Sequence, residues 1–240
     1  REAPFDYGVQ ARAILGHMVH QHEWVQEGQP MMDPVVKQIK FVPETPFTDP
    51  SYHLPHFYEA FSRYGDEADR AFWQQAAEVS RLFLAQAMDE NTGMASEYTE
   101  FDGTPKQLFH DGQFYSDAYR VAMNIGLDTC WTGGNPLLAR RVDALQRFFA
   151  ESSKGMDFDT YLIDGTALGR PALHPHAIVA TLAAGSIATL TLPEAPYAKE
   201  WIKRFWALPL RQGDRRYYDN CLHFFCLLML AGAYGLLKCS

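Results

Sequence analysis

The chain has 240 residues, of which 47% are hydrophobic and 14% aromatic, which is typical of a globular protein and excludes a disordered one. Its formal net charge of −8 leaves no basic stripe to neutralise phosphates, so neither nucleic acid nor an anionic membrane surface is an expected partner. A neutral or cationic ligand fits this charge better.

The first predicted element covers residues 5–19, from Phe5 to Val19, and reads as a helix in the middle of a fold. Its apolar side chains Ile14, Leu15, Met18 and Val19 need partners, which we expect from a segment upstream of Arg1. His17, His20 and His22 lie in or beside this tract and raise the alternative of a metal site. Because histidines at helical spacing more often form a solvated helix face, we predict no metal and no cofactor.

Three later segments are predicted to be amphipathic helices with explicit start signals. One opens at Asp66, one at Asn135 and Pro136, and one at Pro196. Asn135 is a favoured cap residue, and a proline fits the first helical position. The apolar stripes of the three helices are Phe72, Ala76, Val79, Phe83 and Ala87, then Leu138, Val142, Leu145 and Phe149, then Tyr197, Trp201 and Phe205.

Three further helical segments are apolar nearly all round, namely Tyr119 to Leu127, Ile178 to Leu190 and Cys221 to Leu230. A helix without a polar face is buried on every side. The buried segments alternate with the amphipathic ones, which favours helical hairpins in two concentric layers, an α/α toroid. An ordinary globular α domain is the alternative. Short β-prone pieces at 37–42, 94–101 and 160–163 read as loop hairpins.

The segments that enter the buried helices are rich in aromatic residues, His, Arg and Asp. They begin near Tyr52, Ser116, Pro175 and Tyr218. In a toroid all inner helices run the same way, so these entrances would converge on one rim. We therefore expect a polar and aromatic cleft there.

The four cysteines, Cys130, Cys221, Cys226 and Cys239, lack the paired spacing of metal ligands. Buried free thiols in a reducing compartment are the better interpretation, which predicts a cytoplasmic location. Because we expect the natural N-terminus to lie upstream, a secreted or periplasmic location stays open.

At the same entrances the sequence resembles the family 8 glycoside hydrolases, and most of all their reducing-end xylose-releasing exo-oligoxylanases. The matching runs are FTDPSYHLPHFYE (47–59), EY (97–98) with DGTP (102–105), YSDAYRVA (115–122) with NIGLD (124–128), LHP (173–175) and RRYYDN (215–220). The runs follow family order across nearly the whole chain. The resemblance implies an all-α, (α/α)6 barrel, here incomplete, with residues 1–240 as the C-terminal part of one catalytic domain and short β hairpins in its loops.

The resemblance implies inverting hydrolysis, with Asp117 as the catalytic base and Tyr52 holding the attacking water. We expect backbone N–H groups at the helix entrance to keep Asp117 ionised. From the residues alone, Asp117 reads better as a plain helix cap. The family's general acid and a sugar-gripping aspartate belong to an upstream segment, so this segment is an expected partner and the isolated chain is expected to be inactive.

The resemblance also implies a xylo-oligosaccharide substrate and a set of residues that bind it. His174 matches the histidine that recognises the free hydroxyl at the reducing end, and its loop closes the cleft so that a single xylose is released. A surface histidine with its hydrogen bonds satisfied, ahead of a proline that starts a helix, is the alternative. Tyr115 and Arg120 are further expected substrate-binding residues. Arg216, Tyr217 and Tyr218 could stack on or hydrogen-bond to sugar rings, although these two tyrosines could equally pack the last inner helix.

Two other functions stay open from the sequence. One is an endo-acting xylanase or glucanase of the same family, which an open cleft beside His174 would favour. The other is a noncatalytic carbohydrate-binding remnant of the fold, although a pure binder has no need of the pair Asp117 and Tyr52.

Overall fold

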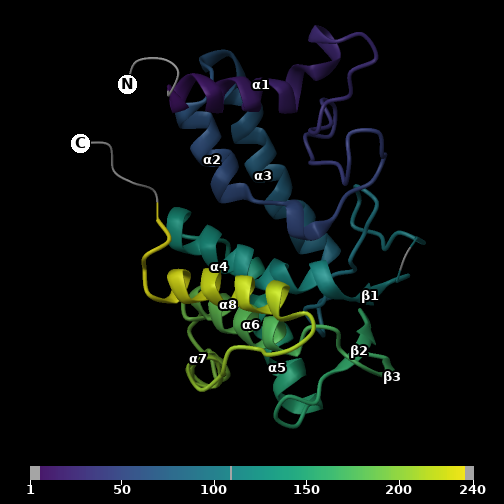
Figure 1. Ribbon diagram of the computed structural model, residues 1–240, viewed down its shortest axis with the longest axis vertical. Coiled ribbons are helices and arrows are strands. Elements are labelled where there is room, and N and C mark those ends of the chain that lie inside the picture. The colour runs from purple at the N-terminus through teal and green to yellow at the C-terminus, as the bar shows by residue number, and fades with distance from the viewer. Residues whose placement is uncertain (1–5, 109, 236–240) are drawn as a thin grey trace.

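The computed structural model describes residues 6–108 and 110–235, which are mostly helical (Figure 1). The helices are α1 (Tyr7–Trp24), α2 (Pro55–Tyr64), α3 (Arg70–Ala87), α4 (Arg120–Thr132), α5 (Pro136–Ser152), α6 (Pro175–Thr189), α7 (Ala198–Trp206) and α8 (Arg216–Leu230). Short 3-10 helices, η1 (Pro50–Tyr52), η2 (Glu67–Asp69) and η3 (Ser116–Tyr119), precede α2, α3 and α4. In the described part of the chain, no helix has the length and apolar character needed to cross a membrane.

The helices form two rows. In one row α2 contacts α4, α4 contacts α6, and α6 contacts α8. In the other row α3 packs on α2, α5 on α4 and α6, and α7 on α5 and α6, while α1 lies across the ends of α2 and α3 (Figure 1). The predicted alternation of central and outer helices is therefore confirmed for α4 to α7.

The central helices α4 and α6 are buried on all sides, as their apolar sequence predicts. In α4 every residue from Val121 to Thr129 is buried. Hydroxyl groups in such helices must find partners, because a buried unpaired polar group is costly. Thr129 donates to the carbonyl of Ile125 at 2.9 Å, and Thr181 in α6 donates to that of Ala177 at 2.9 Å. The hydroxyls are thus satisfied inside their own helices.

The prediction of all-round burial is wrong for α8. Leu222, Cys226 and Met229 are buried, whereas Phe224 is 54% and Phe225 40% exposed. α8 packs mainly on α6, and its Cys226 lies 3.7 Å from Met123 of α4. Apolar composition alone does not reveal how many faces of a helix have neighbours.

The outer helices follow their local signals. The Asn135 side chain accepts hydrogen bonds from the N–H groups of Leu137 and Leu138, so α5 begins where the cap predicts. The helix expected from Asp66 begins as the 3-10 turn η2 before α3, and the helix expected at Pro196 begins two residues later. Their buried stripes include Phe83 in α3 and Trp201 in α7.

Described elements cover part of the apolar face of α1, for which we expected partners from upstream. Val19 is buried, and Leu15 and Met18 pack beside it against a cluster that includes Tyr58 of α2 and Trp73 of α3. Ile14 alone of the four predicted residues is largely exposed. Phe5 lies outside the described residues.

A small antiparallel sheet lies at the edge of the helical layers (Figure 1). Its strands β1 (Gln113–Phe114), β2 (Asp159–Leu162) and β3 (Ala167–Pro171) pair in chain order. The piece predicted at 160–163 therefore lies largely in a strand. The pieces at 37–42 and 94–101 form only isolated bridges, such as Met32 with Ile39 and Thr48 with Thr99.

The described cysteines are free thiols. Cys226 is buried, which raises the pKa of its thiol, whereas Cys221 is half-buried and Cys130 is exposed. Burial was therefore predicted correctly for Cys226 and wrongly for Cys130. Cys239 lies outside the described residues.

Replacing Gly126 by Ala is expected to lower the stability of the fold. A Cβ atom at Gly126 in α4 would lie 2.3 Å from the carbonyl oxygen of Ala184 in α6, so the two helices would have to move apart. Such overpacking costs about 1–3 kcal/mol. Chemical denaturation would measure the loss. The same substitution at the exposed Gly8 of α1, whose neighbours are side-chain ends, is the control and is expected to be neutral or stabilising.

Candidate active site

The entrances of the inner helices converge, as the sequence predicts. Arg120 at the start of α4 donates to the Ser51 hydroxyl in η1 at 2.7 Å, and Asn124 donates to the Ser51 carbonyl at 2.8 Å. The Tyr218 hydroxyl at the start of α8 donates to the Ser116 carbonyl in η3 at 2.9 Å. Segments up to about a hundred residues apart in sequence are thereby joined at one place.

Asp117 lies in η3 at this junction, with 26% of its side chain exposed. Its carboxylate is 3.1 Å from the guanidinium of Arg120, one turn later. Neither η3 nor α4 has a side-chain cap hydrogen bond, so the interpretation of Asp117 as a plain helix cap is wrong. The partner of the carboxylate is Arg120 and not the backbone N–H groups that we expected.

Arg120 also connects Asp117 with Tyr52. Its guanidinium lies over the Tyr52 ring, 5.7 Å from the ring centre, within the range of a cation–π contact. Burial raises the pKa of the Tyr52 hydroxyl, and the negative charges of Asp49 and Asp117 raise it further against the effect of Arg120. Tyr52 and Arg120 line a cavity of about 330 Å³ whose other walls are mostly apolar. The phenol thus stays protonated beside the carboxylate.

Asp49 is a charged residue of this site that sequence reasoning missed. Its side chain is fully buried, and one carboxylate oxygen accepts the N–H of Ser51 at 2.7 Å. The other oxygen is 3.5 Å from Arg120. Burial, which outweighs the hydrogen bond from Ser51 and the charge of Arg120, raises the pKa of Asp49 to about 7. The sequence Asp-Pro-Ser indicates a turn, but nothing in it reveals the distant arginine.

Tyr98 is a second residue that was missed as a site residue. It packs edge-on against Phe41, whose ring also stacks on Tyr52 at 6.0 Å. Burial raises the pKa of the Tyr98 hydroxyl, and the charges of Glu97 and Asp117 add to this effect. An aromatic wall therefore stands beside the carboxylate, and such a surface suits a sugar ring.

His174 is the N-cap residue of α6 and is only 7% exposed, so it is not the surface histidine of the alternative, although its ring does have a hydrogen-bond partner. Its Nδ1 atom is 3.0 Å from the carboxylate of Asp219 in α8. Arg211 donates to the same carboxylate and to the carbonyl of Leu173. Asp219 and Arg211 were also missed, although the run RRYYDN contains the aspartate.

Tyr218 joins the two halves of the site. Its ring lies 4.3 Å from the ring of His174, while its hydroxyl reaches the carbonyl of Ser116, next to Asp117. Burial raises the pKa of this hydroxyl, and the charges of Asp117 and Asp49 act in the same direction against that of Arg120. The structure therefore brings together five of the predicted site residues: Tyr52, Asp117, Arg120, His174 and Tyr218.

The other three predicted residues, Tyr115, Arg216 and Tyr217, make different contacts. Tyr115 stacks on His110, with ring centres 3.9 Å apart. Arg216 donates to the carbonyl of Gly213, and Tyr217 is 82% exposed. Arg216 and Tyr217 line a separate open cavity of about 630 Å³ at the start of α8.

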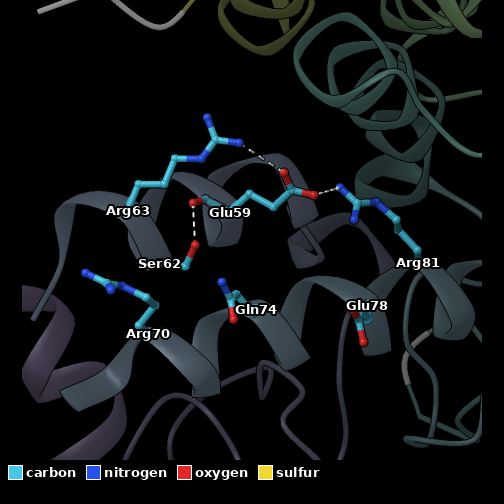
Figure 2. A pocket seen from close by; sticks show the side chains of 7 residues that line it. All are labelled: Glu59, Ser62, Arg63, Arg70, Gln74, Glu78 and Arg81. Carbon is cyan, nitrogen blue, oxygen red and sulfur yellow. Dashed lines mark hydrogen bonds and ion pairs between the residues drawn. The ribbon is translucent and has the colours of Figure 1, made fainter. Parts of the chain in front are cut away.

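A further cavity of about 520 Å³ lies between α2 and α3 and contains none of the predicted residues (Figure 2). Glu59 accepts from Arg81 at 2.6 Å and lies 3.8 Å from Arg63. Arg81 also pairs with the buried Asp128 at 2.7 Å. Glu59 and Asp128 are thus both paired with arginines in this network. We assign these ion pairs a role in holding the helices together, and Glu59 offers a paired carboxylate outside the active site with which Asp117 can be compared.

Within residues 6–108 and 110–235, no group of three or more His, Cys, Asp or Glu side chains is placed to hold a metal ion. His20 bonds to Asp69 at 2.7 Å and to Glu23 at 2.8 Å. Burial lowers the pKa of His20, but these two carboxylates outweigh it, so the net shift is upward.

The chain is similar to known proteins over nearly its whole length. The model of the glycosyl hydrolases family 8 matches residues 5–232. The chain is 48% identical, over 97% of its length, to the reducing-end xylose-releasing exo-oligoxylanase Rex8A of Paenibacillus barcinonensis, and covers 60% of that protein. It is also 48% identical, over 96% of its length, to the exo-oligoxylanase of the same description from Halalkalibacterium halodurans, and covers 58% of it.

The similarity extends to solved structures. A variant of Rex8A in complex with an arabinofuranosyl-xylotetraose superposes with a TM-score of 0.94 at 47% identity, covering 100% of this chain and 62% of the other. The chain thus spans about 60% of the length of these relatives. On the family match and on these identities, the chain belongs to glycosyl hydrolase family 8.

Proposed function

We propose that the protein is an inverting glycoside hydrolase that releases xylose from the reducing end of xylo-oligosaccharides. The observation that carries this proposal is the contact of Tyr218 with both His174 and the segment of Asp117. It occurs in a chain 48% identical to curated enzymes of that description. Because the chain spans about 60% of their length, the activity is proposed for the whole protein.

Asp117 is the catalytic base in this proposal. Inverting hydrolysis needs a carboxylate that activates water on the face of the sugar opposite the leaving group. The partly exposed carboxylate of Asp117 is open to water, and Arg120 fixes its position. Tyr52, held under the same guanidinium, orients the attacking water. The proton of the water passes to Asp117 as the bond to the anomeric carbon forms.

The general acid is assigned to no residue of this chain. The available carboxylates Glu44, Glu59, Glu97 and Glu100 do not match the acid motif of the family. We propose that the acid and a sugar-gripping aspartate come from an upstream segment of the same enzyme, and that residues 1–240 form the C-terminal part of one (α/α)6 domain. The similarity to proteins of which this chain covers about 60% supports this proposal.

His174 is the specificity residue in this proposal. A histidine that receives a hydrogen bond from the free hydroxyl at the reducing end makes the enzyme cut one xylose from that end. A chain that continues past this position cannot form the bond, because the hydroxyl is replaced by a glycosidic oxygen. The enzyme discriminates against the longer chain because His174 would then be left without its hydrogen-bond partner.

Analysis of products from xylotriose and from reduced xylotriose tests the proposal. The full-length enzyme is expected to release xylose from xylotriose and to leave reduced xylotriose uncut. The alditol end of the reduced sugar has no ring hydroxyl that could bond to His174. Equal cleavage of both would identify an endo-acting enzyme instead. Binding without hydrolysis of either sugar would identify a noncatalytic carbohydrate-binding protein. In the same assay, the 240-residue chain by itself is expected to hydrolyse neither substrate.

A further inference from the structure

The buried carboxylate of Asp219 is hydrogen-bonded to the Nδ1 atom of His174. Asp219 lies in the first turn of α8, and its side chain is fully buried. One oxygen is 3.0 Å from Nδ1 of His174 and also accepts from Arg211. The other accepts the N–H of Ala177 in α6 at 2.8 Å. Arg211 donates in addition to the carbonyl of Leu173 at 3.2 Å, which closes the cluster.

These bonds fix Asp219 relative to the start of α6. That helix has no side-chain cap from its own N-cap residue, His174. The carboxylate of Asp219 supplies the missing acceptor to Ala177 from a different helix, where the helix dipole favours a negative charge. The imidazole and its carboxylate are therefore both anchored to the same turn of α6.

The electrostatics of the cluster decide which nitrogen of His174 carries the proton. Burial alone would raise the pKa of Asp219, but the hydrogen bonds from His174, Arg211 and Ala177 outweigh it and lower the pKa. An ionised carboxylate only accepts hydrogen bonds, so Nδ1 must be the donor. In the neutral imidazole, Nε2 is then the acceptor and the one ring nitrogen left for a ligand.

We propose that Asp219 is the positioning residue that keeps the proton of His174 on Nδ1, so that Nε2 accepts a hydrogen bond from the reducing-end hydroxyl of the substrate. This inference rests on the proposed function, which places that hydroxyl at His174. Asp219 itself does not touch the sugar. Asp219 fixes the orientation of the His174 ring and keeps Nε2 of that ring as a hydrogen-bond acceptor. Carboxylates bonded to catalytic histidines have the same effect in other enzymes.

Nitrogen NMR of the histidine side chains tests the tautomer without any substrate. The signals of His174 are assigned by their loss in His174→Gln. In the wild-type enzyme Nδ1 is expected to be protonated and Nε2 unprotonated. In Asp219→Asn, the amide oxygen stays on the N–H of Ala177, and the NH₂ group takes the place of the oxygen that faced His174 and Arg211. The NH₂ group then donates to Nδ1, and the proton of the imidazole moves to Nε2. A wild-type proton on Nε2, or the same tautomer in both proteins, would overturn the proposal.

Kinetics then separate positioning from stability. Asp219→Asn is expected to lower kcat/KM for xylotriose by about tenfold, while the affinity for reduced xylotriose, measured as an inhibitor, changes little, because only the free hydroxyl of xylotriose meets a donor instead of an acceptor. Asp128→Asn is the matched control, since Asp128 is also buried and arginine-bound but lies beside Arg81. Its substrate preference is expected to equal that of the wild type.

A loss of affinity for reduced xylotriose in Asp219→Asn equal to the loss of kcat/KM on xylotriose would assign Asp219 a purely structural role and contradict the inference. A wild-type enzyme that cuts both sugars equally would refute the proposed function. The NMR result would still decide whether Asp219 sets the tautomer of His174, so the two failures are distinguishable.

Discussion

Replacing Asp117 by Asn is expected to reduce kcat on xylotriose by a factor on the order of 10²–10⁴, the usual contribution of a general base. An amide oxygen can still accept from Arg120, which lies 3.1 Å from the carboxylate, so the geometry around Tyr52 is retained. The amide cannot take a proton from water. The loss should therefore appear in kcat, with little change in KM or in the melting temperature.

Glu59→Gln is the matched control for this experiment. Glu59 has a similar side-chain exposure, 28% against 26% for Asp117, and is likewise bound to an arginine (Figure 2). It lies between α2 and α3, outside the cluster of Asp117 and His174. The amide at this position is expected to leave kcat unchanged. Wild-type activity in Asp117→Asn would remove the assignment of Asp117 as the base.

The parts of the fold that could be predicted from sequence are those set by local chemistry. Asn135 and Pro136 specify the start of α5, because the cap and the proline act within one turn. The sequences of α4 and α6 are apolar on every face, which predicts burial from the composition of each helix alone. In α8 a similarly apolar sequence led to a wrong prediction of burial, because Phe224 and Phe225 are largely exposed. An apolar side chain is compatible with burial but does not require it. Whether a neighbour covers them depends on tertiary packing.

The candidate site divides in the same way. Motif resemblance led to Asp117, Tyr52 and His174, which stand at helix entrances where aromatic and charged residues gather. It did not lead to Asp49 or Asp219 as site residues. Their roles come from pairs 71 and 45 residues apart, with Arg120 and His174, and such pairs leave no periodicity or cap signal in the sequence.

Asp49 differs from an ordinary paired carboxylate because it is fully buried and only one of its two oxygens accepts a hydrogen bond from the described residues. Ser51 satisfies one oxygen, while the other has no hydrogen-bond partner among the described residues and lies 3.5 Å from Arg120. Arg120 faces Asp117 as well, at 3.1 Å. One guanidinium thus serves two carboxylates, and burial raises the pKa of Asp49 from 3.8 to about 7.

The raised pKa of Asp49 predicts that the protein loses stability as the pH rises from about 4 to 7. In that range the folded protein binds the proton of Asp49 more tightly than the unfolded chain does. Stability must therefore fall with increasing pH. The rise to about 7 corresponds to roughly 4 kcal/mol, at about 1.4 kcal/mol per pKa unit. Asp49→Asn keeps the acceptor for Ser51 and carries no charge at any pH.

The variant Asp49→Asn is accordingly expected to match the wild type near pH 4 and to be more stable near pH 8, by a melting-temperature difference on the order of 10 °C. Thermal unfolding of both proteins at pH 4, 6 and 8 measures this, and the contributions of other groups cancel in the difference. A difference that does not change with pH would mean that Asp49 keeps an ordinary pKa in the fold. A difference that grows with pH would mean that burial keeps Asp49 protonated well above the ordinary pKa of an aspartate, although Arg120 lies 3.5 Å away.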